Sequence, residues 1–181
     1  LDCLTAAIID YCELQVKAGV DSIMLFDSWG GALTPEAYLQ FSLAPMAKIV
    51  QEFKRRCPDT PITIFTRSAN LPYTAMLATG ADALGLDWTV DIAQAFAVVD
   101  KRAALQGNLD PSILYASPDT VKAKVNELLT AVAGRPGHIF NLGHGIHPQA
   151  PIESVAAMVE AVCEFRASRS EEHTSELQSP D

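Results

Sequence analysis

The chain has 181 residues, a formal net charge of −9, 49% hydrophobic residues and 19% charged residues. This composition is typical of one globular α/β domain with an ample core. The acidic balance argues against a nucleic-acid or anionic-membrane partner. No apolar run reaches the roughly 18 residues needed to cross a bilayer.

The hydrophobic pattern alternates between helices and short apolar strands. Strands are predicted at 22–26, 61–65, 83–86, 103–106 and 138–142. Helices are predicted at 2–18, 34–56, 91–98, 117–133 and 152–166, with a short one ending at Thr79. Pro45 is expected to break the second helix into two pieces. Five strands alternating with helices predict an α/β fold with a parallel sheet covered by helices.

Both ends of the sequence differ from the body. The chain opens on Leu1 without an initiator Met, inside a helical pattern. Residues 169–181 lack helical periodicity and resemble a translated sequencing-library adapter. We therefore expect a native body of residues 1–168 and a non-native tail of residues 169–181.

The cysteines show no metal-ligand spacing. We interpret them as reduced thiols of a cytoplasmic protein that carries no signal peptide. They are Cys3, Cys12, Cys57 and Cys163.

Polar side chains gather where the predicted strands end. The carboxyl edge of a parallel sheet is where ligands bind, in (β/α)₈ barrels and doubly wound sheets alike. The sequence therefore predicts a binding site at this edge. Its candidates are Asp27, Ser28, Thr66, Arg67, Asp87, Trp88, Asn108, Asp110, Asn141 and His144.

His144 stands between Gly143 and Gly145 directly after the fifth strand. The glycines would let the backbone pass close to a ligand or adopt positive φ. The imidazole could act on a ligand or form a purely structural hydrogen bond. This segment alone leaves both interpretations open.

Other chemistries fit the pattern less well. The Gly143–Gly145 pair lacks the third glycine of a dinucleotide loop, since Pro148 stands there. No metal site is expected, because strand alternation points His138 away from His144 and no cysteine or carboxylate joins them. We interpret His147 as a solvated loop residue.

The segment after the first strand offers two further candidates. Ser28 is not set in a G-x-S-x-G elbow, so a hydrogen-bonding role is favoured over a nucleophilic one. Asp27 is a candidate general base, although a cap for the following loop is favoured. Trp29 and Trp88 could stack on a flat ligand or simply pack under loops.

Four motifs in order resemble the uroporphyrinogen decarboxylase family, with residues 1–168 matching its C-terminal part. The resemblance implies an incomplete (β/α)₈ barrel with about five C-terminal βα units. It also implies cofactor-independent conversion of uroporphyrinogen III to coproporphyrinogen III and four CO₂ in haem biosynthesis, by a cytoplasmic homodimer. The motifs are Phe26-Asp27-Ser28-Trp29-Gly30-Gly31, Gly85-Leu86-Asp87-Trp88, Leu105-Gln106-Gly107-Asn108-Leu109-Asp110-Pro111 and Phe140-Asn141-Leu142-Gly143-His144-Gly145.

The resemblance also implies roles for single residues. Ser28 matches a Ser/Thr that hydrogen-bonds a substrate carboxylate, and Phe26 matches an apolar residue lining the cleft. His144 matches a histidine that contacts substrate and has been considered a proton donor. The loop 66–70 departs from the glycine-rich sequence of the family. The family's aspartate, arginine cluster and tyrosine are expected upstream of Leu1, so we expect the fragment alone to be inactive.

Two other functions stay open. A corrinoid-dependent methyltransferase shares the barrel and binds zinc through His and Cys, but this sequence has no cysteine at 66–68 or at 144. A non-catalytic remnant or five-stranded ligand-binding module would lack porphyrin turnover even with the upstream half supplied.

Overall fold

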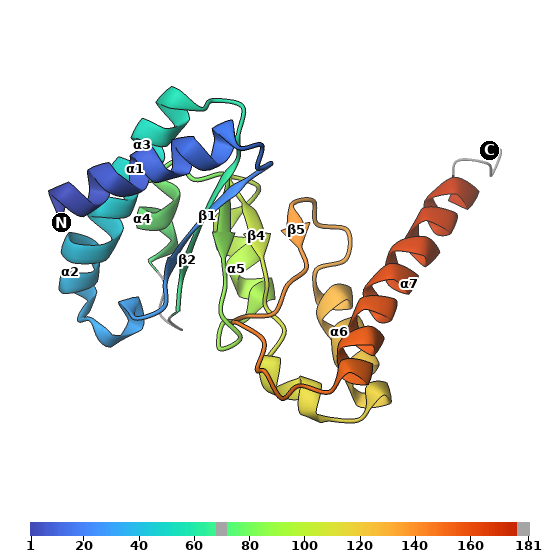
Figure 1. The fold of residues 1–181 in the computed structure, drawn as a ribbon. Coiled ribbons are helices and arrows are strands. Elements are labelled where there is room, and N and C mark those ends of the chain that lie inside the picture. Colours follow the sequence, from blue (N-terminus) through green and yellow to red (C-terminus); the bar gives the residue numbers. More distant parts are fainter. Residues whose placement is uncertain (68–71, 177–181) are drawn as a thin grey trace.

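Five strands form one parallel sheet in the computed structural model, which describes residues 1–67 and 72–176 (Figure 1). Neighbouring strands are also consecutive in the chain. All five predicted strands are present, each within a few residues of its expected position. They are β1 (Ile23–Asp27), β2 (Ile62–Thr66), β3 (Ala83–Gly85), β4 (Ala104–Gln106) and β5 (His138–Ile139).

Helices connect the strands. A right-handed crossover between adjacent parallel strands places its helix on one face of the sheet, so a consecutive strand order puts the crossover helices on the same face. This order differs from a doubly wound sheet, where the strand order reverses. The helices are α1 (Asp2–Lys17), α2 (Pro35–Tyr38), α3 (Ala44–Arg56), α4 (Tyr73–Leu77), α5 (Ile92–Val99), α6 (Pro118–Ala131) and α7 (Ile152–Glu176), with 3-10 helices η1 (Gly30–Ala32) and η3 (Pro111–Tyr115).

The core lies in two clusters. The larger cluster packs α3, α4 and α5 on the sheet, and every residue of β2 is buried, as expected for a central parallel strand. Phe53 and Leu84 are fully buried within it. The smaller cluster joins α6 to α7 through residues such as Val125 and Ala161. Figure 1 shows these two helices side by side, beyond β5.

The N-caps of two predicted helices are present. Thr34 Oγ1 accepts a hydrogen bond from Ala37 N at 3.3 Å, with Pro35 in the first turn of α2. Ser117 Oγ accepts one from Thr120 N at 3.4 Å at the start of α6. These hydroxyls satisfy N–H groups that have no partner within the helix.

Pro45 does not break the helix as expected. The chain stays helical through α2, a π-helical turn η2 (Leu39–Leu43) and α3, and Pro45 lies in the first turn of α3. Proline removes the N–H that would bond to residue 41 and crowds that carbonyl. The wider π turn accommodates both effects, so the hydrogen-bond pattern changes while the helical path continues.

Helix α7 is longer than predicted. Its backbone is helical to Glu176, whereas the hydrophobic pattern predicted an end at residue 166. Residues 167–176 contain neither proline nor glycine, so no helix-breaking residue ends it earlier. No helix in the described part of the chain is both long and apolar enough to cross a membrane.

We predict that Phe53→Ala lowers the free energy of unfolding by about 3–5 kcal/mol, because it leaves a cavity under α3. Phe41, which is 52% exposed on η2, provides the matched control. Phe41→Ala should change this free energy by less than about 1 kcal/mol. Urea unfolding followed by circular dichroism measures both, and equal losses would contradict the described core.

Candidate functional site

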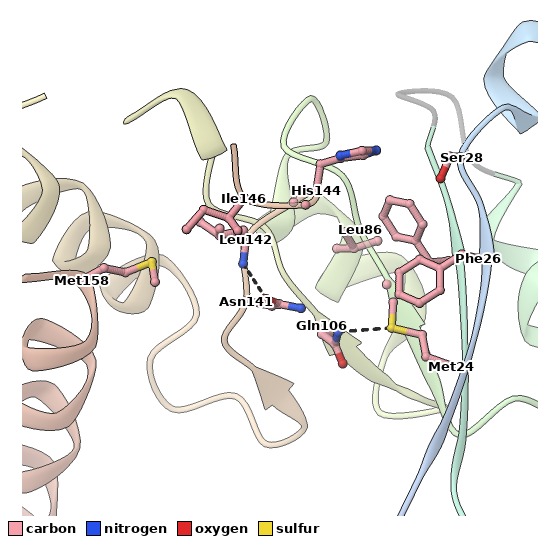
Figure 2. A pocket seen from close by; sticks show the side chains of 14 residues that line it. Met24, Phe26, Ser28, Leu86, Gln106, Asn141, Leu142, His144, Ile146 and Met158 are labelled. Carbon is pink, nitrogen blue, oxygen red and sulfur yellow. Dashed lines mark hydrogen bonds between the residues drawn. The ribbon is translucent and has the colours of Figure 1, made fainter. Parts of the chain in front are cut away.

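A hollow of about 530 Å³ opens at the carboxyl ends of the strands (Figure 2). Phe26 and Ser28 line one side, and Phe65 lies beside Phe26. His144 lies on the loop after β5, and Met158 of α7 closes the far side. The three predicted site residues Phe26, Ser28 and His144 therefore line the same hollow.

Strand alternation explains why Phe26 and Ser28 share a face. Side chains two residues apart point to the same side of a strand. Phe26 pairs in register with Phe65 of β2, and their ring centroids are 5.7 Å apart. Phe26 is 68% exposed and offers an apolar surface to the hollow.

Asp27 holds the loop that follows β1. Its Oδ1 accepts a hydrogen bond from Trp29 N at 3.0 Å, and its Oδ2 accepts one from Ser42 Oγ of η2. Both carboxylate oxygens thus hold structure around Ser28. This arrangement fits the loop cap that the sequence favoured over a general base.

His144 belongs to a row of ring contacts across the strand ends. Its ring centroid lies 6.4 Å from that of Phe65 and 5.9 Å from that of Trp88, both in edge geometry. The Trp88 ring has a second contact, because Arg67 Cζ lies 5.1 Å from its centre. The imidazole itself is exposed, and Figure 2 shows it at the rim of the hollow.

Gly143 places this imidazole. A Cβ at Gly143 would lie 2.8 Å from Trp88 Cα and closer still to Trp88 N, so a side chain cannot fit there. Gly143 N also donates to Leu109 O at 2.7 Å, next to an isolated parallel bridge between Leu109 and Leu142. The expectation of positive φ was wrong at both Gly143 and Gly145; Gly143 instead approaches the protein's own backbone, and it also lines the hollow. Gly145 has open space around it.

Several polar residues at the strand ends hold loops and lie off the hollow. Asn108 is buried, and its Nδ2 donates to Asp87 O at 2.8 Å and to Val90 O at 2.7 Å. The Asp87 carboxylate accepts from Thr89 N at 2.7 Å. Asp110 caps η3 by accepting from Ser112 N at 2.8 Å. The sequence grouped these residues with the site, but their hydrogen bonds are structural.

His138 and His147 are separate from His144. His138 Nε2 donates to Gly107 O at 2.7 Å, and burial lowers the pKa of His138 below its ordinary 6.5, although this bond opposes the shift. The His147 ring lies 5.8 Å from that of Tyr115. No three His, Cys, Asp or Glu side chains in the described part of the chain gather as metal ligands would.

Comparison with known proteins gives the family. Residues 1–165 match the family model described as uroporphyrinogen decarboxylase (URO-D). The chain belongs to the uroporphyrinogen decarboxylase family. A uroporphyrinogen decarboxylase of Legionella pneumophila (strain Lens) is 48% identical over 162 residues, covering 90% of this chain and 46% of the relative.

Two further relatives carry the same name. The uroporphyrinogen decarboxylase of Saccharophagus degradans is 48% identical over 169 residues, covering 92% of this chain and 48% of the relative. The uroporphyrinogen decarboxylase of Serratia proteamaculans is 50% identical over 164 residues, covering 90% of this chain and 46% of the relative. The chain spans about half the length of the curated relatives it matches.

The sequence missed some residues that line the hollow of this family member. Phe65 and Gln106 both line it, and Gln106 Nε2 lies 3.5 Å from Met24 Sδ. A polar residue within an apolar strand was the available signal for Gln106. For Phe65 the signal was its position two residues before Arg67. Residues 68–70 of the loop predicted to depart from the family lie outside the described residues.

We predict that Gly143→Ala lowers the free energy of unfolding by about 1–3 kcal/mol, because the new methyl group must displace the Trp88 backbone. Gly145→Ala is the matched control, with nothing within 4 Å of the added Cβ. Urea unfolding compares the two variants. A Gly143→Ala variant as stable as Gly145→Ala would contradict the close approach.

The lowered pKa of His138 predicts a pH dependence of stability. Below pH 6.5 the unfolded chain binds a proton at this site more readily than the folded chain does. The free energy of unfolding should therefore fall as the pH is lowered from 6.5 towards the folded pKa. His138→Gln should reduce the slope of the free energy of unfolding against pH. His147→Gln, a change at an exposed position, should leave this slope unchanged. Urea midpoints from pH 7.5 to 5 test this, and an unchanged slope in His138→Gln would refute it.

Proposed function

We propose that this protein acts as a uroporphyrinogen decarboxylase. The reaction would convert the four acetate side chains of uroporphyrinogen III to methyl groups, giving coproporphyrinogen III and four CO₂ without a cofactor. One observation carries the proposal in a chain of this family: Phe26, Ser28 and His144 face one hollow. The activity is proposed for the whole decarboxylase, because the chain spans about half of its relatives.

The lining of the hollow suits an apolar tetrapyrrole ring with acidic arms. Phe26 and Phe65 form an apolar wall, on which the faces of a tetrapyrrole could pack. The Ser28 hydroxyl stands at the edge of this wall and can donate a hydrogen bond to a carboxylate. We therefore assign Phe26 and Ser28 to substrate binding.

His144 is the proposed proton donor. Protonation of a pyrrole carbon makes the ring an electron sink, so the bond between the acetate methylene and its carboxylate can break and release CO₂. The electron pair enters the ring, the ring carbon gives up the proton that it first accepted, and the exocyclic methylene takes up a proton to become methyl. An exposed imidazole at the rim can supply that proton. Such catalysis contributes about 10²–10⁴-fold, so other groups must supply the rest of the 10⁶-fold or more that enzymes reach.

The same proposal covers the architecture of the whole protein. Residues 1–168 would form the C-terminal part of a (β/α)₈ barrel, with residues 169–181 a tail outside it. The consecutive parallel strands and the end of the family match at residue 165 support this assignment. A cytoplasmic homodimer is proposed from family membership.

No specific observation favours the methyltransferase alternative. Zinc in such an enzyme would need thiolates at the rim of the hollow. The cysteines lie elsewhere: Cys3 and Cys12 on α1, Cys57 after α3 and Cys163 on α7.

We predict that a chimera regains turnover when residues 1–165 replace the matching segment of the Serratia proteamaculans enzyme. In this chimera His144→Asn should lower kcat by tenfold or more while KM changes less than threefold, because the imidazole acts in the chemical step. His147→Asn is the matched control and should keep full turnover. Coproporphyrinogen III formation, followed as its oxidised porphyrin, measures all three.

Two outcomes would contradict the proposal at different levels. A folded chimera without turnover would contradict the proposed decarboxylase function and favour a non-catalytic remnant or a ligand-binding module. A loss below tenfold in His144→Asn, with turnover otherwise intact, would remove only the role of His144 as an essential acid.

A further inference from the structure

Arg67 is a charged side chain that the proposed mechanism does not use. It directly follows β2, and its backbone N–H donates to Asp27 O at 3.1 Å. This bond extends the β1–β2 ladder by one residue beyond the paired Asp27 and Thr66. The backbone position of Arg67 is therefore fixed by the sheet.

Alternation places Arg67 on the side of the hollow. Thr66 points the other way, where its buried hydroxyl lies 3.0 Å from the Tyr38 hydroxyl. Phe65 lines the hollow, and Arg67 follows it by two residues on the same face. Continuing the register makes Ser28 the neighbour of Arg67, and adjacent strands lie about 4.8 Å apart. This register brings the backbone positions of Ser28 and Arg67 next to each other at one edge of the sheet.

Trp88 holds the guanidinium near the imidazole. Arg67 Cζ lies 5.1 Å from the Trp88 ring centre, and the His144 ring lies 5.9 Å from the same side chain. Arg67 Cζ and the centre of the His144 ring are therefore no more than about 11 Å apart. A cation–π contact uses the face of the guanidinium and leaves the N–H groups at its edge available.

Those N–H groups have no acceptor within the described part of the chain. The other arginines whose side chains the structure describes donate to carboxylates or carbonyls. Arg55 and Arg56 bind acidic side chains, while Arg102 and Arg135 bind backbone oxygens. Arg67 is exposed, and its guanidinium lies over the Trp88 ring.

We propose that Arg67, held over Trp88 and beside Ser28, binds a carboxylate on an acidic arm of the ligand in the hollow. Arginine stays charged at all working pH values, and its planar fork matches a carboxylate with two parallel hydrogen bonds. The proposal rests on the proposed function in that the ligand is a polycarboxylate tetrapyrrole. It adds a residue that selects for carboxylate arms.

Binding of uroporphyrin III, the oxidised form with eight carboxylates, tests this role in the 181-residue chain and in the chimera. Arg67→Gln should raise Kd at least fivefold at low salt, and the difference should shrink as salt screens the charge. Arg67→Lys keeps the charge but loses the planar guanidinium, so its Kd should lie between that of the unaltered protein and that of Arg67→Gln. Arg135→Gln is the matched control, since Arg135 stacks on Phe96 away from the hollow. Porphyrin fluorescence measures each Kd.

The outcomes separate the inference from the function on which it rests. If the unaltered protein binds uroporphyrin III and Arg67→Gln binds within twofold of it, the role of Arg67 is overturned and the decarboxylase proposal stands. An equal loss in Arg135→Gln would also overturn it, because a general charge effect would then explain the result. If neither the chain nor the chimera binds or turns over tetrapyrrole, the proposed function falls, and the inference falls with it.

Discussion

The site depends on the close packing of two backbones, that of Gly143 against that of Trp88. β5 has only two residues, so the sheet ladder alone does little to hold the loop that follows it. The bond from Gly143 N to Leu109 O and the contact with Trp88 fix this loop over the neighbouring strand ends. Because the Trp88 ring contacts both His144 and Arg67, this packing determines how the imidazole lies relative to the indole, while the sheet fixes the backbone of Arg67.

The polar residues at the strand ends divide into two groups by their hydrogen bonds. Asp27, Asp87 and Asn108 have partners in the surrounding loops, and these bonds are the framework of the site. Buried polar groups need such partners, because leaving them unpaired is costly. His144 and the Arg67 guanidinium stand exposed with ring contacts. The framework thus leaves the chemically versatile groups available to a ligand.

Local patterns in the sequence predicted most of the fold. Apolar runs located all five strands, and Thr34 and Ser117 located two helix starts. They also placed Ser28 and His144 at one edge, because strand ends in a parallel sheet share an edge, whereas Phe26 was implied only by the family resemblance. Local patterns could not show that Gly143 meets Trp88, since this contact joins loops 55 residues apart in sequence. Local patterns also could not predict the π turn before Pro45, because it depends on how the helix backbone adapts to the proline in three dimensions.

The placement of Trp88 has an optical consequence. The sequence contains two tryptophans, and the other, Trp29, is 78% exposed. Replacing Trp29 by phenylalanine would leave Trp88 as the single indole chromophore. The Arg67 guanidinium lies over its ring, and the His144 imidazole contacts it in edge geometry. Indole emission responds to nearby charge and polarity, so the ultraviolet emission of that variant would be an intrinsic, label-free signal from the rim of the hollow.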